Sequence, residues 1–148
     1  MIVIGYPGVG KSTLAWSYKE YVDLESSTFF NGDERPEDWY VYYCKIAEDL
    51  SKQRKVVFVS SHKAVMDELH NSHEKVVIVY PTSFLKEDWI KKLQDRYDNT
   101  HSDKDLKAYL RAKEHYDEDI KLMKSYNFRK VELYDIGYCL KCEIEECR

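Results

Sequence analysis

The sequence predicts an α/β fold in which a five-stranded parallel sheet lies between two layers of helices, a three-layer α/β/α arrangement. Short apolar runs alternate along the chain with longer amphipathic segments, and this alternation is typical of parallel sheets covered by helices. The runs are continuous, as expected for strands buried on both faces. With 148 residues, the chain suits one domain, 1–148, with a single core.

The first half of the chain supplies three of the expected strands. Residues 1–4 read MIVI and form the first, residues 21–24 read YVDL and form the second, and residues 56–59 read VVFV and form the third. A helix is expected from Lys11, because apolar side chains recur every three or four residues after it. A second helix is expected over 36–52 on the same ground, and Pro36 suits its first turn.

The second half continues the alternation. A short helix is expected over 63–70, and residues 76–80, VVIVY, form the fourth strand. Amphipathic helices are expected over 85–97 and 104–126, separated by the polar stretch 98–103, and a last strand over 130–134. We find no internal repeat, linker or low-complexity segment.

Composition narrows the classes of partner. The formal net charge is −4. The chain therefore lacks the excess of basic residues that is typical of proteins that bind long nucleic acid or an anionic membrane. No apolar stretch approaches the length of a membrane-spanning helix. Because a strand begins at residue 1 or 2, no room is left for a targeting peptide, and a cytoplasmic location with reduced thiols is expected. Monomer and homodimer both remain open.

The loop after the first strand carries the most specific signal. Residues 5–12 read GYPGVGKS, which is the spacing of the phosphate-binding loop, or Walker A motif. Glycines let the backbone turn its N–H groups toward an anion, the lysine reaches the β- and γ-phosphates, and the serine hydroxyl ligates Mg²⁺. The nucleotide-binding residues predicted here are Gly5, Gly8, Val9, Gly10, Lys11, Ser12 and Thr13.

This motif near the N-terminus, the chain length and the five short strands resemble the small P-loop kinases: nucleoside monophosphate kinases, shikimate kinase and gluconate kinase. The chain also resembles small phage-encoded proteins described as nucleotide kinases. The resemblance implies a P-loop NTPase fold with a helical lid, ATP and Mg²⁺ as cofactors, and a small-molecule phosphate acceptor. It covers nearly the whole chain in layout, but only the phosphate-binding loop is specific at residue level.

Two acidic residues, Asp23 and Glu25, follow the second strand and are expected beside the phosphate-binding loop. They resemble the F-x-D-x-D pattern of shikimate kinases, which implies that Asp23 organises the Mg²⁺ shell and that Glu25 meets the acceptor. A carboxylate near the γ-phosphate can also accept a proton from an attacking hydroxyl. The alternative is that Asp23 caps a helix and that Glu25 is a solvated surface residue.

The third strand ends without the acid of a usual Walker B motif and continues as Ser60, Ser61 and His62. Shikimate kinases also lack an acid here but carry glycines instead, so shikimate itself is a doubtful acceptor. The two serines are candidate hydrogen-bond donors to the acceptor, and His62 is a candidate phosphate contact. Alternatively, Ser61 caps the helix that follows.

Arginines matter because phosphoryl transfer spreads negative charge over three oxygens. Arg96 and Arg111 flank a predicted lid at about 97–105, where the resembled kinases place arginines that close on ATP. Arg111 with Tyr116 also resembles the R-x-x-x-x-Y run after the shikimate kinase lid. Arg35 lies where nucleoside monophosphate kinases place an arginine for the acceptor phosphate. Each arginine has the alternative of a solvated surface position.

The tail, 138–148, contains Cys139, Cys142 and Cys147 in the spacing C-x-x-C-x-x-x-x-C. Metal sites usually add a second ligand pair, and Cys44 is the one other cysteine. Reduced thiols are therefore expected rather than a zinc site.

These observations predict an ATP- and Mg²⁺-dependent phosphotransferase acting on a small molecule, a nucleoside monophosphate before others. Lys11, Asp23, Arg96 and Arg111 are the predicted catalytic residues, and Ser12 with Asp23 the metal ligands. Glu25, Arg35, Ser60, Ser61 and His62 are the predicted acceptor residues. Two alternatives stay open: a kinase of a hydroxyl group on a metabolite or a nucleic-acid 5′ end, and an ATP-binding switch without transfer. The guanine-specific N-K-x-D motif is absent, which disfavours a GTPase.

Overall fold

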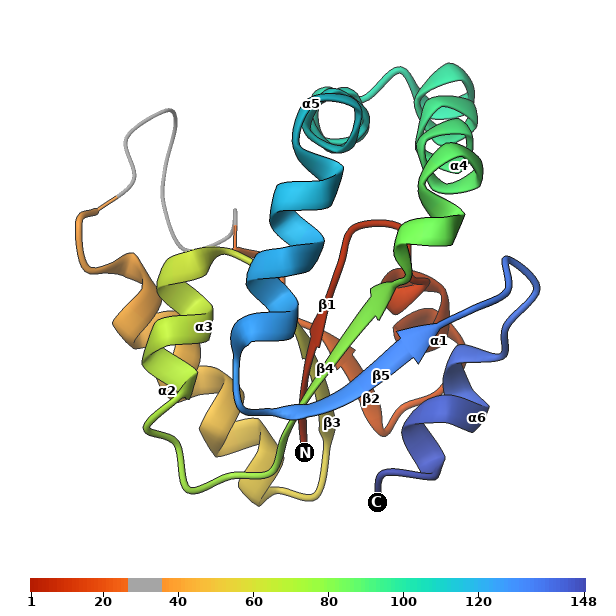
Figure 1. Ribbon diagram of the computed structural model, residues 1–148. Helices are drawn as coiled ribbons and strands as arrows, with labels where there is room; N and C mark the ends of the chain where they lie inside the picture. Colours follow the sequence, from red (N-terminus) through yellow and green to blue (C-terminus); the bar gives the residue numbers. More distant parts are fainter. Residues whose placement is uncertain (27–35) are drawn as a thin grey trace.

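The computed structural model describes residues 1–26 and 36–148, and its centre is a five-stranded parallel sheet (Figure 1). The strand order is β2-β3-β1-β4-β5, and every neighbouring pair is parallel. The strands are β1 Ile2–Gly5, β2 Tyr21–Asp23, β3 Val56–Val59, β4 Val76–Pro81 and β5 Arg129–Leu133. All residues of β1, β3 and β4 are buried, as their continuous apolar runs predict.

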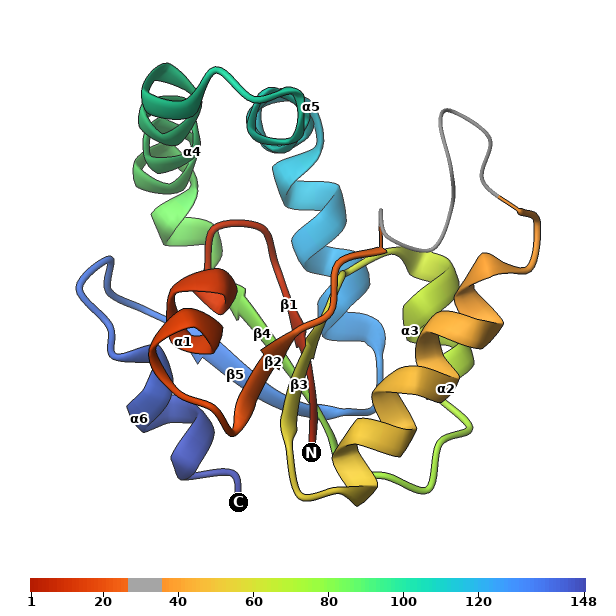
Figure 2. The ribbon, with the colours of Figure 1, turned by 180° about the vertical axis from the view of Figure 1, so that it is seen from behind.

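Six α-helices surround this sheet in the part of the chain described. They are α1 Lys11–Ser17, α2 Trp39–Lys52, α3 Lys63–Leu69, α4 Lys86–Thr100, α5 Asp103–Ser125 and α6 Leu140–Glu145, with a short 3₁₀ helix, η2 Ser83–Leu85, before α4. Helices α2, α3 and α5 cover one face of the sheet, and α1 and α6 lie on the other (Figures 1 and 2). The α/β fold class is therefore confirmed, with helices on both faces.

One cluster of buried side chains joins these layers. It runs from Ile2 in β1 to Cys147 after α6 and includes the aromatic residues Tyr43, Tyr80, Trp89 and Tyr116. No helix among the described residues has both the length and the apolar character needed to cross a membrane.

Helix α2 begins later than predicted. The sequence favours a helix from Pro36, whereas the first helical residue is Trp39. A turn precedes the helix, closed by a hydrogen bond from the Trp39 N–H to the carbonyl of Pro36 at 3.2 Å. Because this bond spans three residues, it forms a turn and not the first turn of an α-helix.

The polar stretch predicted to be a loop, 98–103, is largely helical. Helix α4 continues to Thr100 and α5 begins at Asp103, so two residues connect them. His101 takes a left-handed conformation with φ 53°, and the Ser102 hydroxyl caps α5 by accepting from the Asp105 N–H at 3.1 Å. We call α4, this connection and the first half of α5 the helical hairpin. It stands above the end of the sheet where the strands finish (Figure 1).

Candidate functional site

The loop between β1 and α1 takes the backbone shape that its glycines allow. Gly8 and Gly10 have φ values of 92° and 107°, in the left-handed region that side chains disfavour. A Cβ on Gly8 would lie 3.1 Å from Nε1 of Trp89. A Cβ on Gly5 would lie 2.9 Å from Cδ of Lys11. Gly8 and Gly10 are therefore required by their backbone conformation. Gly5 and Gly8 are required because neighbouring side chains leave no room for a Cβ.

Two aromatic side chains hold the carbonyl groups of this loop. The Trp89 indole donates to the Pro7 carbonyl at 2.8 Å, and the Tyr138 hydroxyl donates to the Val9 carbonyl at 2.7 Å. The two rings stack on each other with centroids 5.9 Å apart, and the ammonium of Lys92 lies 4.4 Å from the indole centroid. Trp89 is fully buried. The loop is therefore fixed from outside by α4 and by the segment before α6.

The side chain of Tyr6 fixes the same loop against α5. It is 2% exposed and meets Tyr116 of α5 edge to face, with ring centroids 5.7 Å apart. Tyr116 in turn donates to the Thr82 carbonyl at 2.7 Å. The sequence singles out Tyr116 as part of a pattern with Arg111, and the structure places it as a support for the loop.

Lys11 lies at the start of α1 with its ammonium 3.3 Å from the carbonyl of Gly5. Burial lowers the pKa of Lys11, and this effect exceeds the opposing influence of the Asp23 and Glu25 carboxylates. Arg96 and Lys104 lower it further by like-charge repulsion. Four charged side chains thus act on Lys11, and we call the five, with Ser12, the candidate site: Lys11, Ser12, Asp23, Glu25, Arg96 and Lys104.

Asp23 reaches this site although its strand is not adjacent to β1. The sequence places Asp23 beside the loop directly, whereas β3 lies between β2 and β1. Burial raises the pKa of Asp23, Lys11 opposes the rise, and Glu25 adds to it. Asp23 and Ser12 line one surface depression of about 340 Å³, together with Ala15, Trp16, Tyr21 and Val22. The two predicted metal ligands are thus brought to the same place.

The ends of β2 and β3 are joined by Tyr43 of α2. Its hydroxyl donates to the Leu24 carbonyl at 2.6 Å and accepts from the Ser60 N–H at 2.9 Å. The side chains of Ser60 and His62 contact each other, with Oγ and Nδ1 2.7 Å apart. The N-cap of α3 is His62, without a side-chain capping bond, so the interpretation of Ser61 as the cap is wrong. Tyr43 therefore fixes the ends of β2 and β3 relative to each other, contacts that its place on an amphipathic helix does not predict.

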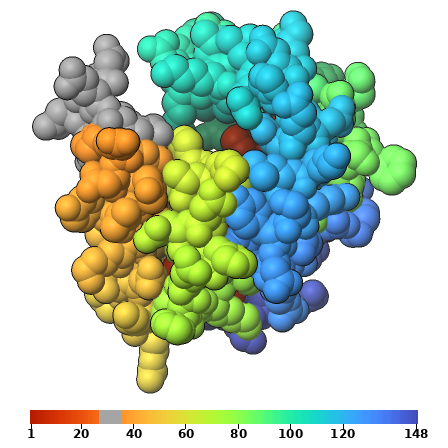
Figure 3. All heavy atoms as spheres, turned by 60° about the vertical axis from the view of Figure 1, so that its left-hand side comes forward, coloured from red at the N-terminus to blue at the C-terminus, as the bar shows by residue number. Residues whose placement is uncertain are grey.

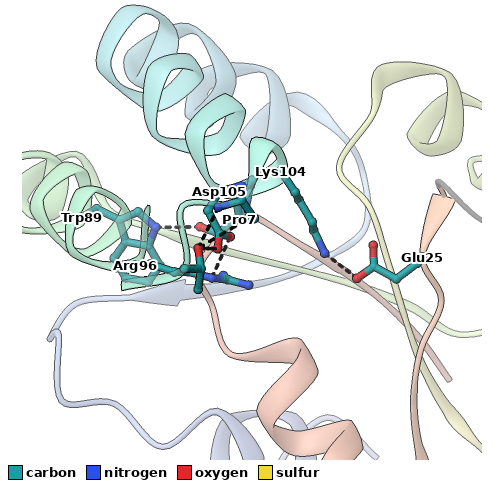
Figure 4. Close-up of polar contacts among 8 residues, drawn as sticks. Pro7, Glu25, Trp89, Arg96, Lys104 and Asp105 are labelled. Atoms are coloured by element: carbon teal, nitrogen blue, oxygen red, sulfur yellow. Dashed lines mark hydrogen bonds and ion pairs between the residues drawn. The ribbon is translucent and has the colours of Figure 1, made fainter. Parts of the chain in front are cut away.

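Two ion pairs involve the helical hairpin, one that joins it to Glu25 and one within it (Figure 4). Lys104 at the start of α5 reaches Glu25, with Nζ and Oε1 2.5 Å apart. Arg96 of α4 pairs with Asp105 of α5, with Nε and Oδ1 3.0 Å apart. Burial of Asp105 opposes its ionisation, but hydrogen bonding by Thr100 and Ser102 and the charge of Arg96 outweigh burial and lower the pKa of Asp105. Arg96 is therefore held by a carboxylate within the hairpin.

Arg111 is placed differently from Arg96. Its guanidinium makes a two-pronged contact with Asp119, with distances of 2.9 Å and 2.8 Å. The two residues are eight positions apart on α5, and non-helical φ/ψ angles at His115 kink the helix between them. The charge of Arg111 acts on Tyr6 of the loop, but Asp119 neutralises much of it. Arg35, the other predicted arginine, lies outside the described residues.

The space-filling view shows a hollow between the α5 side and the α3 side of the molecule (Figure 3). Atoms from the first part of the chain, drawn in red, are visible at its floor.

The cysteines of the tail depart from the expected reduced state. Cys139 and Cys142 form a disulfide, while Cys147 and Cys44 are free and buried. Among residues 1–26 and 36–148, no three His, Cys, Asp or Glu side chains are grouped to hold a metal ion. A pair of oxygen donors, as Ser12 and Asp23 present, suits Mg²⁺ that arrives with a nucleotide and keeps phosphate and water ligands.

No model of a known protein family matches the chain, and no curated protein matches its sequence. What the chain does is therefore inferred from its residues and their arrangement.

Proposed function

We propose that this chain is an ATP- and Mg²⁺-dependent phosphotransferase of the small P-loop kinase type and that its acceptor is a nucleoside monophosphate. One observation carries the proposal: Lys11 directly follows a loop whose Gly8 and Gly10 take left-handed φ angles, and the carboxylate of Asp23, at the end of β2, acts on the charge of Lys11. A loop of this sequence and shape suits phosphate, since its N–H groups and one lysine offer positive charge without a large side chain in the way.

Each residue of the candidate site has a role in this proposal. Lys11 contacts the β- and γ-phosphates, and Ser12 and Asp23 are the protein ligands of Mg²⁺, Asp23 directly or through water. Mg²⁺, when bound with the nucleotide, neutralises charge on the phosphate oxygens. Val9, Gly10 and Thr13 complete the nucleotide contacts. The pKa of Lys11, lowered by burial, returns upward when phosphate supplies the missing negative charge.

The helical hairpin supplies the remaining positive charge. Lys104 and Arg96 are its two cations at the site, and both are paired with carboxylates. A phosphate arriving between them competes with Glu25 and Asp105 for these cations. We propose that this exchange closes the hairpin and excludes water as charge develops during transfer.

The runner-up is a kinase with a hydroxyl acceptor. It is favoured by one observation, the raised pKa of the half-buried Asp23 beside Glu25, since a carboxylate with a raised pKa is a better general base. A phosphate acceptor needs no such base. Ser60, Ser61 and His62 line the acceptor side in either case. A third candidate, a nucleotide-binding switch, requires the same loop but predicts no transfer.

Labelled ATP separates these candidates. The protein is incubated with γ-labelled ATP, Mg²⁺ and a panel of nucleoside monophosphates, nucleosides and small hydroxyl metabolites, and label transfer is measured. Transfer to a monophosphate supports the proposal, and transfer to a hydroxyl supports the runner-up. Binding of ATP without transfer to any acceptor supports the switch.

The matched control is a pair of lysine variants. Lys11→Ala should abolish transfer, whereas Lys121→Ala, at an exposed position on α5, should leave it unchanged. Equal transfer by both variants would contradict the proposed role of the loop.

A further inference from the structure

The cysteine pair of the tail is adjacent to the phosphate-binding loop in space. Cys139 lies between two residues that contact the loop: Tyr138, whose hydroxyl donates to Val9 at 2.7 Å and Gly8 at 3.4 Å, and Leu140. The Cδ2 of Leu140 is 3.6 Å from the place where a Cβ on Gly10 would lie. Helix α6 and the segment before it pack beside α1 (Figure 2). The disulfide therefore lies within the segment whose side chains, Tyr138 and Leu140, contact the loop.

The disulfide is also accessible to reagents. Cys139 and Cys142 are exposed, whereas Cys44 and Cys147 are buried. Burial raises the pKa of Cys44 to about 12, so its reactive thiolate is scarce. Of the four cysteines in the chain, the exposed pair is the one that a soluble thiol can reach.

We propose that Cys139 and Cys142 form a reversible thiol–disulfide site that exchanges with dithiol reductants and sets the order of the phosphate-binding loop. In the oxidised form, the bridge closes a short ring from Cys139 to Cys142 and so restricts the backbone between Tyr138 and α6. In the reduced form, this restriction is removed, and Tyr138 and Leu140 hold the loop less firmly. Loss of pre-organisation weakens ligand binding.

The exchange balances as follows. A thiolate of the reductant attacks one cysteine sulfur, the S–S bond breaks, and the other cysteine leaves as a thiolate that takes up a proton. The second thiol of the reductant then attacks the mixed disulfide and releases the first cysteine. Two electrons and two protons pass to the protein, and the reductant becomes a disulfide.

The test compares oxidised and dithiothreitol-reduced protein without nucleotide. Alkylation in denaturant, which exposes the buried cysteines, followed by mass spectrometry should show two free thiols before reduction and four after it. Amide exchange at Val9, whose N–H donates to the Tyr6 carbonyl at 3.3 Å, should be faster in the reduced protein. A pair that stays reduced after treatment with oxidised glutathione, or equal exchange in the two forms, would overturn the inference.

Two variants separate the pair from other effects of reductant. Cys139→Ser/Cys142→Ser retains Cys44 and Cys147, so it should behave as the reduced protein whether or not dithiothreitol is present. Tyr138→Phe keeps the ring stacked on Trp89 but removes the hydroxyl contact to Val9. It should reduce the difference between the oxidised and reduced forms. A full redox response in the double serine variant would contradict the inference.

The effect on ATP rests on the proposed function. Reduction should raise the Kd for ATP by roughly fivefold or more, a size common for coupling between two sites. Redox-dependent exchange in a protein that binds ATP in neither form would support the thiol site and end the proposed function. Equal ATP affinity in the two forms, with ATP bound, would overturn the coupling.

Discussion

The loop between β1 and α1 and the helical hairpin both border the candidate site, but they are held in different ways. Carbonyl groups of the loop accept hydrogen bonds from Trp89 and Tyr138, and the indole is fully buried. The hairpin is joined to the β2 side by the Lys104–Glu25 ion pair, whose side chains are 63% and 37% exposed. Exposed ion pairs contribute at most about 1 kcal/mol. Trp89 belongs to α4, so the first part of the hairpin helps to hold the loop, whereas the far end of the hairpin at Lys104 is joined to Glu25 by an exposed ion pair. We therefore expect the loop to be formed before ligand binds and the far end of the hairpin, residues 97–105, to move.

Lys11→Ala removes the charge that the formed loop presents. Turnover should fall by roughly 10²- to 10³-fold, the size seen when one donor to developing charge is lost. The melting temperature should stay close to that of the wild type, because burial already disfavours the charged form of Lys11. Steady-state kinetics and thermal unfolding measure the two effects. A variant with normal turnover would show that the loop does not serve phosphate.

Asp23→Asn separates chemistry from stability. Loss of the carboxylate should lower kcat by roughly 10²-fold, whether it organises the metal or accepts a proton. Asp95→Asn, at an exposed position on α4, is the control and should leave kcat unchanged.

The stability of the same variant should change in the opposite direction. Burial raises the pKa of Asp23 above its usual value of 3.8, so ionising this carboxyl costs the folded state free energy, and the cost is complete only above the raised pKa. Asp23→Asn should therefore raise Tm at pH 7. This gain should disappear as the pH falls toward 3.8, because the wild-type carboxyl then becomes protonated. A lower Tm at pH 7 would show that its contact with Lys11 dominates.

The two arginines test which part of the hairpin moves. Arg96→Ala should lower kcat by roughly tenfold or more with a smaller effect on ATP affinity, because its contact with phosphate would form during transfer. Arg111→Ala should have a smaller effect, since Asp119 holds its guanidinium at two points. The ratio of the two kcat values measures this. A larger loss of kcat from Arg111→Ala would show that Arg111 of α5, and not Arg96 of α4, contacts phosphate during transfer.

Lys104→Met removes the connection between the hairpin and Glu25 and keeps an apolar stem. Because the pair is exposed, the free energy of unfolding should change by less than about 1 kcal/mol. Amide exchange at residues 101–105 should become faster, while exchange at residues 5–10 stays unchanged. Equal acceleration in both segments would show that the loop and the hairpin open together.

The sequence is informative where structure depends on local pattern. The strands at residues 56–59 and 76–80 follow directly from apolar runs, and the glycines of the loop follow from its shape. The short connection after Thr100 also had a local signal, since Ser102 and Asp105 stand in the spacing of a capping box. The polar character of residues 98–103, by contrast, favours a loop.

Contacts between distant segments explain the rest. The sequence pattern indicates that Trp89 is a core residue of an amphipathic helix. Its indole also donates a hydrogen bond to the carbonyl of Pro7, 82 positions away. Tyr138 reads as a tail residue, and its contact with Val9 spans 129. The position of β3 between β2 and β1, and the pairing of Arg96 with Asp105, likewise depend on how helices and strands pack. No local pattern predicts such contacts.

Amide exchange followed in the loop and in the hairpin of one sample tests the central claim most directly. Without ligand, the amides of Tyr6 and Val9, which donate to the carbonyls of Val79 and Tyr6, should exchange slowly, and residues 97–105 should exchange faster. Addition of Mg²⁺ and a non-hydrolysable ATP analogue with a nucleoside monophosphate should slow exchange at 97–105 and change exchange at Tyr6 and Val9 much less. Rapid exchange in the loop without ligand, together with an already slow hairpin that does not respond, would contradict a formed loop beneath a movable cover.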